Sequence, residues 1–150
     1  MCNGNRSGQI MEKAFFYIIT IIVLTGCVAE KKEIKAEDVA IGFFDAIYNQ
    51  KDIEKAASFC SPAFSKELKK YITANNAARR LFNMSFDTVN IETGLGDTSV
   101  RRAFSDSGEL TILFTGTRDG KTFKDLKKIK LIKQKDYWYV DQILKDPTFG

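Results

Sequence analysis

The chain has 150 residues, of which 44% are hydrophobic and 12% aromatic, so it is long enough for one domain and apolar enough to bury a core. Its formal net charge of +4 is a mild excess and only a weak signal for nucleic-acid binding. It contains no histidine, which removes the usual general base, the commonest metal ligand and every catalytic arrangement built on a histidine.

The N-terminal segment has the layout of an export signal. Residues 14–24 form an uncharged apolar run, about half of the ~20 residues that a membrane-spanning helix requires. Lys13 precedes the run and small residues follow it, which is the order found in signal peptides. We therefore predict a signal peptide over residues 1–26, in which residues 1–10 are not translated if Met11 is the true start. The other interpretation is a buried helix that ends in a cysteine.

The signal ends in Leu24-Thr25-Gly26-Cys27, which resembles the lipobox of bacterial lipoproteins. The resemblance implies that Cys27 receives a diacylglyceryl group and that a dedicated signal peptidase cuts before it. Each buried CH₂ contributes about 0.8 kcal/mol, so two or three acyl chains give a stable anchor. Residues 27–35 would then be the lipidated cysteine and a short charged tether.

The residue after Cys27 carries information on localisation. Val28 is not aspartate, which resembles the default for sorting to the outer membrane in Gram-negative bacteria. This favours an outer-membrane protein that faces the periplasm. In a Gram-positive host the same chain would lie on the cell-surface membrane.

Residues 36–82 have the periodicity of helices. Val39, Phe43 and Ile47 recur at i, i+4 and i+8, which predicts a helix over residues 36–48. Asp52 is positioned to cap a second short helix that runs through Cys60.

Ser61-Pro62 predicts the start of a third helix, with serine as the cap and proline in the first turn. We expect its buried face to contain Phe64, Leu68, Tyr71 and Ile72. Asn75-Asn76 is expected to end it, and residues 77–82 could add one or two further turns.

From residue 86 onward the hydrophobic period changes to two. Five strands are expected, over residues 86–93, 99–105, 109–117, 121–133 and 137–144. Asp119-Gly120 is the strongest hairpin signal, and Ser107-Gly108 is another. Leu126 and Ile129 are three residues apart, which predicts a β-bulge near Lys127-Lys128. The expected fold is α+β, with N-terminal helices packed on a curved antiparallel sheet of four to six strands.

This layout resembles the nuclear transport factor 2-like, or cystatin-like cone, superfamily over residues 36–146, with residues 147–150 as a tail. The resemblance rests on Phe43-Phe44-Asp45-Ala46-Ile47-Tyr48, on the Lys51-Asp52 step and on the closing Tyr137-Trp138-Tyr139-Val140-Asp141-Gln142-Ile143. It extends to small lipoproteins of unknown function described as lumazine-binding-like. It implies a single cone-like domain.

The cone fold implies a cavity between the helices and the sheet. Its expected lining residues are Phe44, Tyr48, Phe104, Phe114 and Tyr139, together with Asp141 if that residue points inward. In the competing interpretation these aromatic residues simply fill the core.

The expected function is non-enzymatic binding of a small apolar ligand or a protein partner at the cell envelope. One alternative is an enzyme of the ketosteroid isomerase-like type that uses a pocket aspartate, and Asp45, Asp87, Asp125 and Asp141 are the candidates. Another is an interaction protein with a filled core, which could form a homodimer. We expect no cofactor, no metal and no nucleic acid as partners.

Two further features of the sequence have structural interpretations. Cys60 would be the lone thiol of the processed domain, and we expect it to be a buried small hydrophobe. Seven lysines crowd residues 121–135, and they are expected to be a solvated strand surface. The competing interpretation is a contact with anionic lipid heads or cell-wall polymer.

Overall fold

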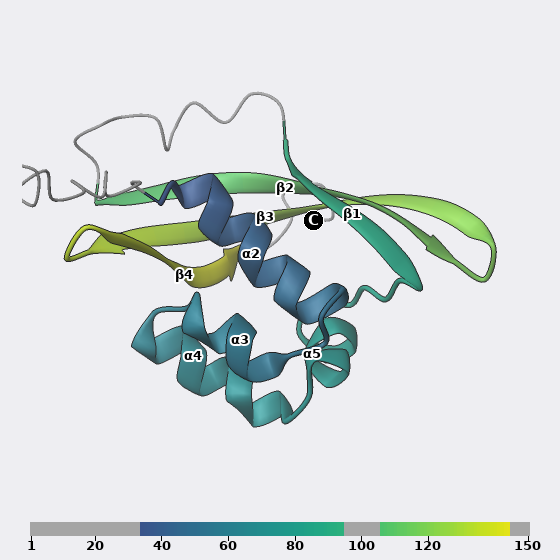
Figure 1. Cartoon of the computed structure of the whole chain (residues 1–150), viewed down its shortest axis with the longest axis horizontal. Coiled ribbons are helices and arrows are strands. Elements are labelled where there is room, and N and C mark those ends of the chain that lie inside the picture. The colour runs from purple at the N-terminus through teal and green to yellow at the C-terminus, as the bar shows by residue number, and fades with distance from the viewer. Residues whose placement is uncertain (1–33, 95–105, 145–150) are drawn as a thin grey trace, which may run out of the picture. The chain divides into compact units, whose positions relative to one another are not determined.

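The computed structural model describes residues 34–94 and 106–144 (Figure 1). The described residues all belong to one compact unit. The signal peptide, Cys27, Phe104 and the expected strand over residues 99–105 therefore lie outside the described residues. Within the described ranges, no helix is both long enough and apolar enough to cross a membrane.

The helices follow the sequence signals closely. They are α2 (Ala36–Tyr48), α3 (Ile53–Ser58), α4 (Pro62–Leu68), the 3₁₀ helix η1 (Lys69–Tyr71) and α5 (Ala74–Arg80). Both predicted caps are confirmed, since Asp52 Oδ1 accepts a hydrogen bond from Lys55 N at 2.9 Å and Ser61 Oγ accepts one from Phe64 N at 3.3 Å.

The end of the third predicted helix differs from the expectation. Ile72 does not belong to the buried face, because the chain turns there with a φ of 69° and leaves its side chain 76% exposed. Asn75-Asn76 does not end a helix but lies inside α5. The reason is that Thr73 Oγ1 accepts a hydrogen bond from Asn76 N at 3.2 Å and so caps a new helix.

Among the described residues, four antiparallel strands form one open sheet in the order β1-β2-β3-β4. They are β1 (Thr88–Thr93), β2 (Ser107–Arg118), β3 (Lys121–Gln134) and β4 (Tyr137–Leu144). Asp119 and Gly120 have φ values of 51° and 72°, which confirms the predicted tight turn between β2 and β3. Ser107-Gly108 is not a turn, because both residues pair with β3. The described fold is therefore α+β, as the sequence predicts.

The predicted bulge near Lys127-Lys128 is wrong, but a bulge does occur in the neighbouring strand β4. At the expected place the pairing of β2 with β3 is uninterrupted, with Leu113 opposite Leu126 and Leu110 opposite Ile129. Strand alternation puts Leu126 and Ile129 on opposite faces, so no bulge is needed there. The irregularity lies in β4. Val140 pairs with Leu131 and Gln142 pairs with Lys130, so Asp141 between them is the extra residue.

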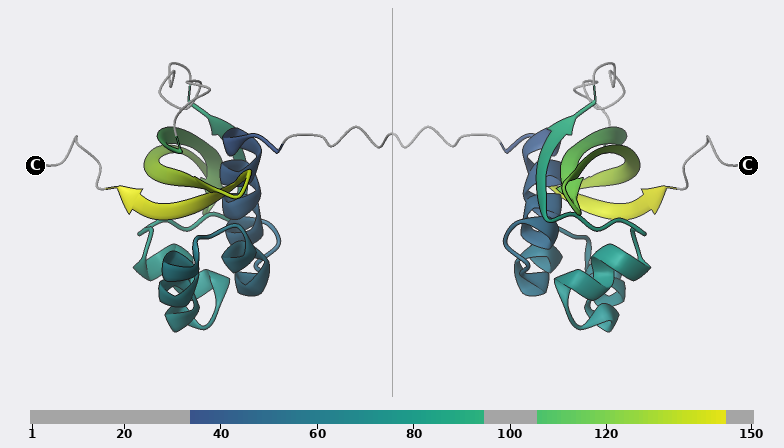
Figure 2. Two further views of the ribbon diagram at one scale, coloured as in Figure 1. Left: turned by 90° about the vertical axis from the view of Figure 1, so that its left-hand side faces the viewer. Right: turned by 90° about the vertical axis from the view of Figure 1, so that its right-hand side faces the viewer.

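The helices lie on one side of the sheet (Figures 1 and 2). Helix α2 contacts β1, β2 and β4, and α4 contacts β4. The sheet face toward the helices is apolar and buried, and its fully enclosed side chains are Leu110, Ile112, Phe114, Ile129, Leu131 and Val140. We call this face the inner face and the opposite one the outer face.

The junction between α3 and α4 is hydrogen-bonded to the edge of the sheet at Val140. Val140 N donates to Phe59 O at 2.9 Å, and Ser61 N donates to Val140 O at 2.8 Å. These bonds form a short parallel bridge between Cys60 and Val140. They satisfy edge groups of β4 and hold α4 beside the bulge at Asp141.

Candidate functional site

Three of the expected cavity residues pack against one another. Phe44 and Phe114 are fully buried, and Tyr48 is 7% exposed. The ring centroids of Phe44 and Phe114 are 4.9 Å apart, and those of Tyr48 and Phe114 are 5.6 Å apart, both edge to face. The rings of Phe43, Phe82 and Phe86 complete this aromatic cluster. The space between α2 and the sheet is thus occupied by rings at this level.

The other expected lining residues lie elsewhere. Tyr139 pairs with Ile132 and lies on the outer face, because its neighbour Val140 is fully buried on the inner face. Its assignment to an inner cavity is therefore wrong. Asp141 does not join the aromatic cluster either, since the bulge places it beside α4. Phe104 lies outside the described residues.

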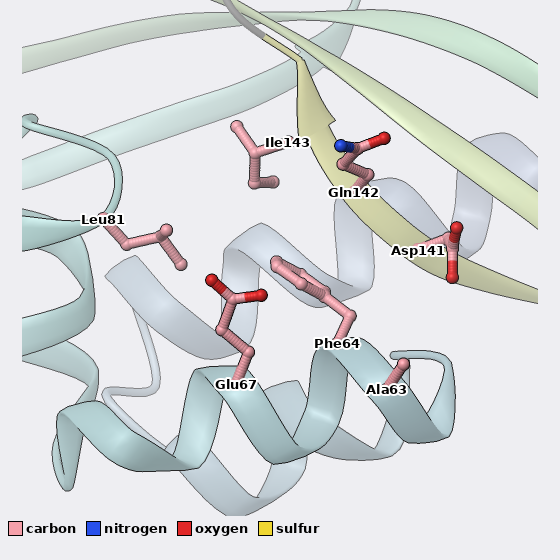
Figure 3. Close-up of a pocket in the computed structure, with 7 residues that line it drawn as sticks. All are labelled: Ala63, Phe64, Glu67, Leu81, Asp141, Gln142 and Ile143. Carbon is pink, nitrogen blue, oxygen red and sulfur yellow. The ribbon is translucent and has the colours of Figure 1, made fainter.

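Asp141 instead lines an open groove of about 450 Å³ between the helices and β4 (Figure 3). The groove is lined by Ala63, Phe64, Glu67, Leu81, Asp141, Gln142 and Ile143. Phe64 is 5% exposed and supplies an apolar wall. Figure 3 shows the Glu67 carboxylate between Leu81 and Phe64, with Asp141 at the other side of the groove.

The groove combines apolar walls with negatively charged side chains. Glu67 and Asp141 contribute carboxylates and Gln142 an amide, and none of the lining residues that the structure describes is basic. Such a surface is complementary to a group that combines an apolar body with a positive charge. Sequence reasoning selected Asp141 but missed Glu67 and Leu81, because their neighbourhood depends on how α4 and the end of α5 meet β4.

The four aspartates considered for an isomerase reaction lie in separate places. The Asp45 carboxylate accepts a hydrogen bond from Asn49 in the turn after α2. Asp87 accepts one from a backbone N–H of the β2–β3 turn, 3.0 Å away. Asp125 is the one whose charge acts on Tyr48, and Asp141 lines the groove.

The Tyr48 hydroxyl is an unusual feature of the aromatic cluster. It is buried and has no hydrogen-bond partner among the described residues. Burial, assisted by the negative charge of Asp125, raises the pKa of Tyr48 above its ordinary value, so the hydroxyl stays neutral. An unsatisfied buried hydroxyl costs about 1–3 kcal/mol, so this group requires explanation.

Two other predicted features can be placed. Cys60 is buried and its Sγ donates to Ala56 O at 3.4 Å, which confirms its interpretation as a small core residue. The lysines of β3 do not form one surface, because alternate residues face opposite sides of the sheet. Lys128 is also paired with Glu109 at 2.6 Å. Within residues 34–94 and 106–144, there is no group of three or more His, Cys, Asp or Glu side chains arranged to hold a metal ion.

Comparison with family models found no match to this chain. Comparison with curated proteins found no match, and neither did comparison with solved structures.

Burial of Cys60 predicts a loss of stability at alkaline pH. Desolvation raises the pKa of this thiol from 9.0 to about 12, so the unfolded chain loses the proton first. The free energy of unfolding should therefore fall as pH rises above 9 toward 12, by at most about 1.4 kcal/mol per pH unit from this group. The free energy of unfolding, measured by urea denaturation at a series of pH values, should fall less steeply with pH in Cys60→Ala than in the wild-type chain. Equal slopes would contradict the assignment.

Proposed function

We propose that this chain is a lipid-anchored protein of the bacterial envelope, held by acyl chains on Cys27. The support is the order of Lys13, the apolar run and the Leu24-Thr25-Gly26-Cys27 motif. In a Gram-negative host it would lie on the outer membrane and face the periplasm. Residues 36–146 would form a single cone-like domain, and the packing of all the described helices on one side of an antiparallel sheet is consistent with this form.

The domain binds a protein partner without catalysing a reaction, and the groove beside β4 is its binding surface. The observation that carries this proposal is the pairing of apolar walls with the Glu67 and Asp141 carboxylates among the described lining residues. A lysine or arginine side chain of a partner offers the matching chemistry, because its aliphatic stem can pack on Phe64 while its charge reaches the carboxylates. The aromatic cluster supports partner binding over an enclosed small apolar ligand, since its rings pack on one another.

The anchor predicts a simple outcome for Cys27→Ser. Without the thiol no lipid can be attached, so the protein should remain unprocessed and should not carry labelled palmitate. Metabolic labelling and electrophoretic mobility measure both effects, and Cys60→Ser is the matched control, which should still be lipidated. A Cys27→Ser chain that is still labelled and cut at residue 27 would contradict the lipobox assignment.

The groove predicts selective binding of a cationic apolar group. Benzylamine should perturb the amide resonances of Ala63, Leu81 and Ile143 in the full chain held in zwitterionic detergent. The double variant Glu67→Gln, Asp141→Asn keeps the shape of the groove but removes both charges, so affinity should fall about tenfold.

Glu54→Gln is the control, because Glu54 is an exposed carboxylate that pairs with Lys69 away from the groove. Its affinity for benzylamine should be unchanged. Perturbations that avoid the groove, or an equal loss in the control, would contradict the proposal.

A further inference from the structure

Positive charge is concentrated in the helical segment between α2 and β1. Residues 49–83, which contain α3, α4, η1 and α5, have seven Lys or Arg and three Asp or Glu residues, a net charge of +4. The described residues of the sheet and its connections, 84–94 and 106–144, have eight of each, a net charge of zero. All seven cations of the helical segment are exposed, and they are Lys51, Lys55, Lys66, Lys69, Lys70, Arg79 and Arg80.

These helices form one layer of the domain. Figures 1 and 2 show α3, α4 and α5 side by side below the sheet, and η1 contacts all three of them. Lys69 of η1 pairs with Glu54 of α3, which joins two of these elements. Lys66 and Lys70 are four residues apart along α4 and η1, so they lie near each other, and neither forms an ion pair with a described residue. We call this layer the basic layer.

The basic layer also carries the most exposed large hydrophobic side chain among the described residues. Ile72 directly follows η1 and is 76% exposed. The residues on both sides of it along the chain bring it close to Lys69 and Lys70, since Ile72 N donates to Lys69 O at 3.1 Å. An aliphatic side chain therefore projects from a surface whose other exposed groups include free cations.

The backbone holds Ile72 in this position at a cost. Its φ of 69° and ψ of −44°, with a hydrogen bond of 2.7 Å from Thr73 N to Tyr71 O, define a classic γ-turn, which is rare and strained. A positive φ is especially unfavourable for a β-branched residue. Asn76 fixes the turn from the next helix, because its Nδ2 donates to Tyr71 O at 3.1 Å and its N to Thr73 Oγ1 at 3.2 Å. Strain that is fixed in this way concentrates at functional positions.

The combination of exposed cations and a projecting aliphatic group matches the surface of an anionic bilayer. Its headgroup phosphates lie at the surface and attract basic side chains, and hydrocarbon lies directly beneath them. A nucleic acid matches the charge, but its phosphate backbone offers no apolar counterpart to Ile72. The bilayer is thus the partner that accounts for both features.

The length of the chain before α2 is compatible with this contact, and this step rests on the proposed anchor at Cys27. Residues 28–35 span at most about 29 Å when fully extended. Helix α2 has 13 residues and a length of about 20 Å, and α3 follows its C-terminal end. The tether is therefore long enough for an anchored domain to turn its basic layer toward the membrane.

We propose that the basic layer lies on an anionic phospholipid bilayer, with the Ile72 side chain among the upper acyl chain segments and Lys66 and Lys70 against the headgroup phosphates. This goes beyond the anchor, because it assigns a membrane-binding surface to the folded domain itself.

NMR of the full chain in bicelles tests this contact. The bicelles are made of phosphatidylcholine with or without added phosphatidylglycerol, and they contain a phosphatidylcholine whose acyl chain carries a nitroxide. With phosphatidylglycerol present, the nitroxide should reduce the intensity of the Ile72 methyl resonances about twofold or more, and clearly less without it. The methyl resonances of Leu126, which is 45% exposed on β3, should keep their intensity and serve as the internal reference.

The charge requirement is tested by the double variant Lys66→Gln, Lys70→Gln, in which the attenuation at Ile72 should fall about twofold or more. Lys121→Gln, Lys124→Gln is the matched control, because it removes the same charge from two exposed lysines of β3. The attenuation at Ile72 should be unchanged in this control.

The apolar contact is tested by Ile72→Asn, because asparagine tolerates a positive φ and the position is exposed, so the fold should be kept. The attenuation of the Lys70 amide resonance should fall in Ile72→Asn and should not change in the control Leu126→Asn.

Four results would overturn the proposal. They are equal attenuation at Ile72 and Leu126, equal attenuation at Ile72 in bicelles without phosphatidylglycerol, an equal loss in the two double variants, and no attenuation at Ile72 in either bicelle. The last result would leave the basic layer to a protein partner. Palmitate labelling tests the anchor separately, so a labelled chain without attenuation at Ile72 would overturn this inference alone.

Discussion

The described fold depends on the packing of the aromatic face of α2 against the inner face of the sheet. Phe44 contacts Phe114 of β2 edge to face, and Phe82 packs on both Phe43 and Phe44 from beyond α5. Aromatic pairs of this kind add about 0.5–1.5 kcal/mol beyond the area that they bury. One cluster thus joins α2, the chain just after α5 and the central strand β2, so the positions of all three are set together.

The same packing explains why the groove beside β4 and a smaller cavity lie at the margins of the cluster. Because aromatic rings fill the space between α2 and the sheet, accessible space is left where the helices meet an edge of the sheet. The groove lies where α4 meets the bulged part of β4, and a smaller cavity, lined by Tyr48 among others, lies where the ends of α2 and α5 meet Phe86. Glu67 and Asp141 line the groove, whereas the exposed residues Lys51 and Arg79 line the smaller cavity.

Local signals in the sequence predicted local structure well. The apolar spacing of α2, the caps at Asp52 and Ser61 and the turn at Asp119-Gly120 each depend on a few neighbouring residues, and each was confirmed. The errors came where tertiary contacts decide. Asp141 could not be recognised as the bulge residue, because the bulge depends on the pairing of β4 with β3 and on the bridge between Val140 and Cys60. The missed bulge also put Tyr139 on the wrong face of the sheet. The smaller cavity at the end of α2 was missed because residues 47–51, 75–79 and 85–86 become neighbours only in the fold.

Xenon binding tests the central claim most directly, namely that the space between α2 and the sheet is filled by side chains. Xenon enters apolar cavities and shifts the resonances of the methyl groups that line them. Under xenon pressure the methyl resonances of Leu110 and Ile112, which precede Phe114 on the inner face of β2, should not move in the wild-type chain. They should move in Phe114→Ala, where removal of the ring opens a cavity. Saturable shifts of Leu110 and Ile112 in the wild-type chain would show an interior chamber and contradict the account.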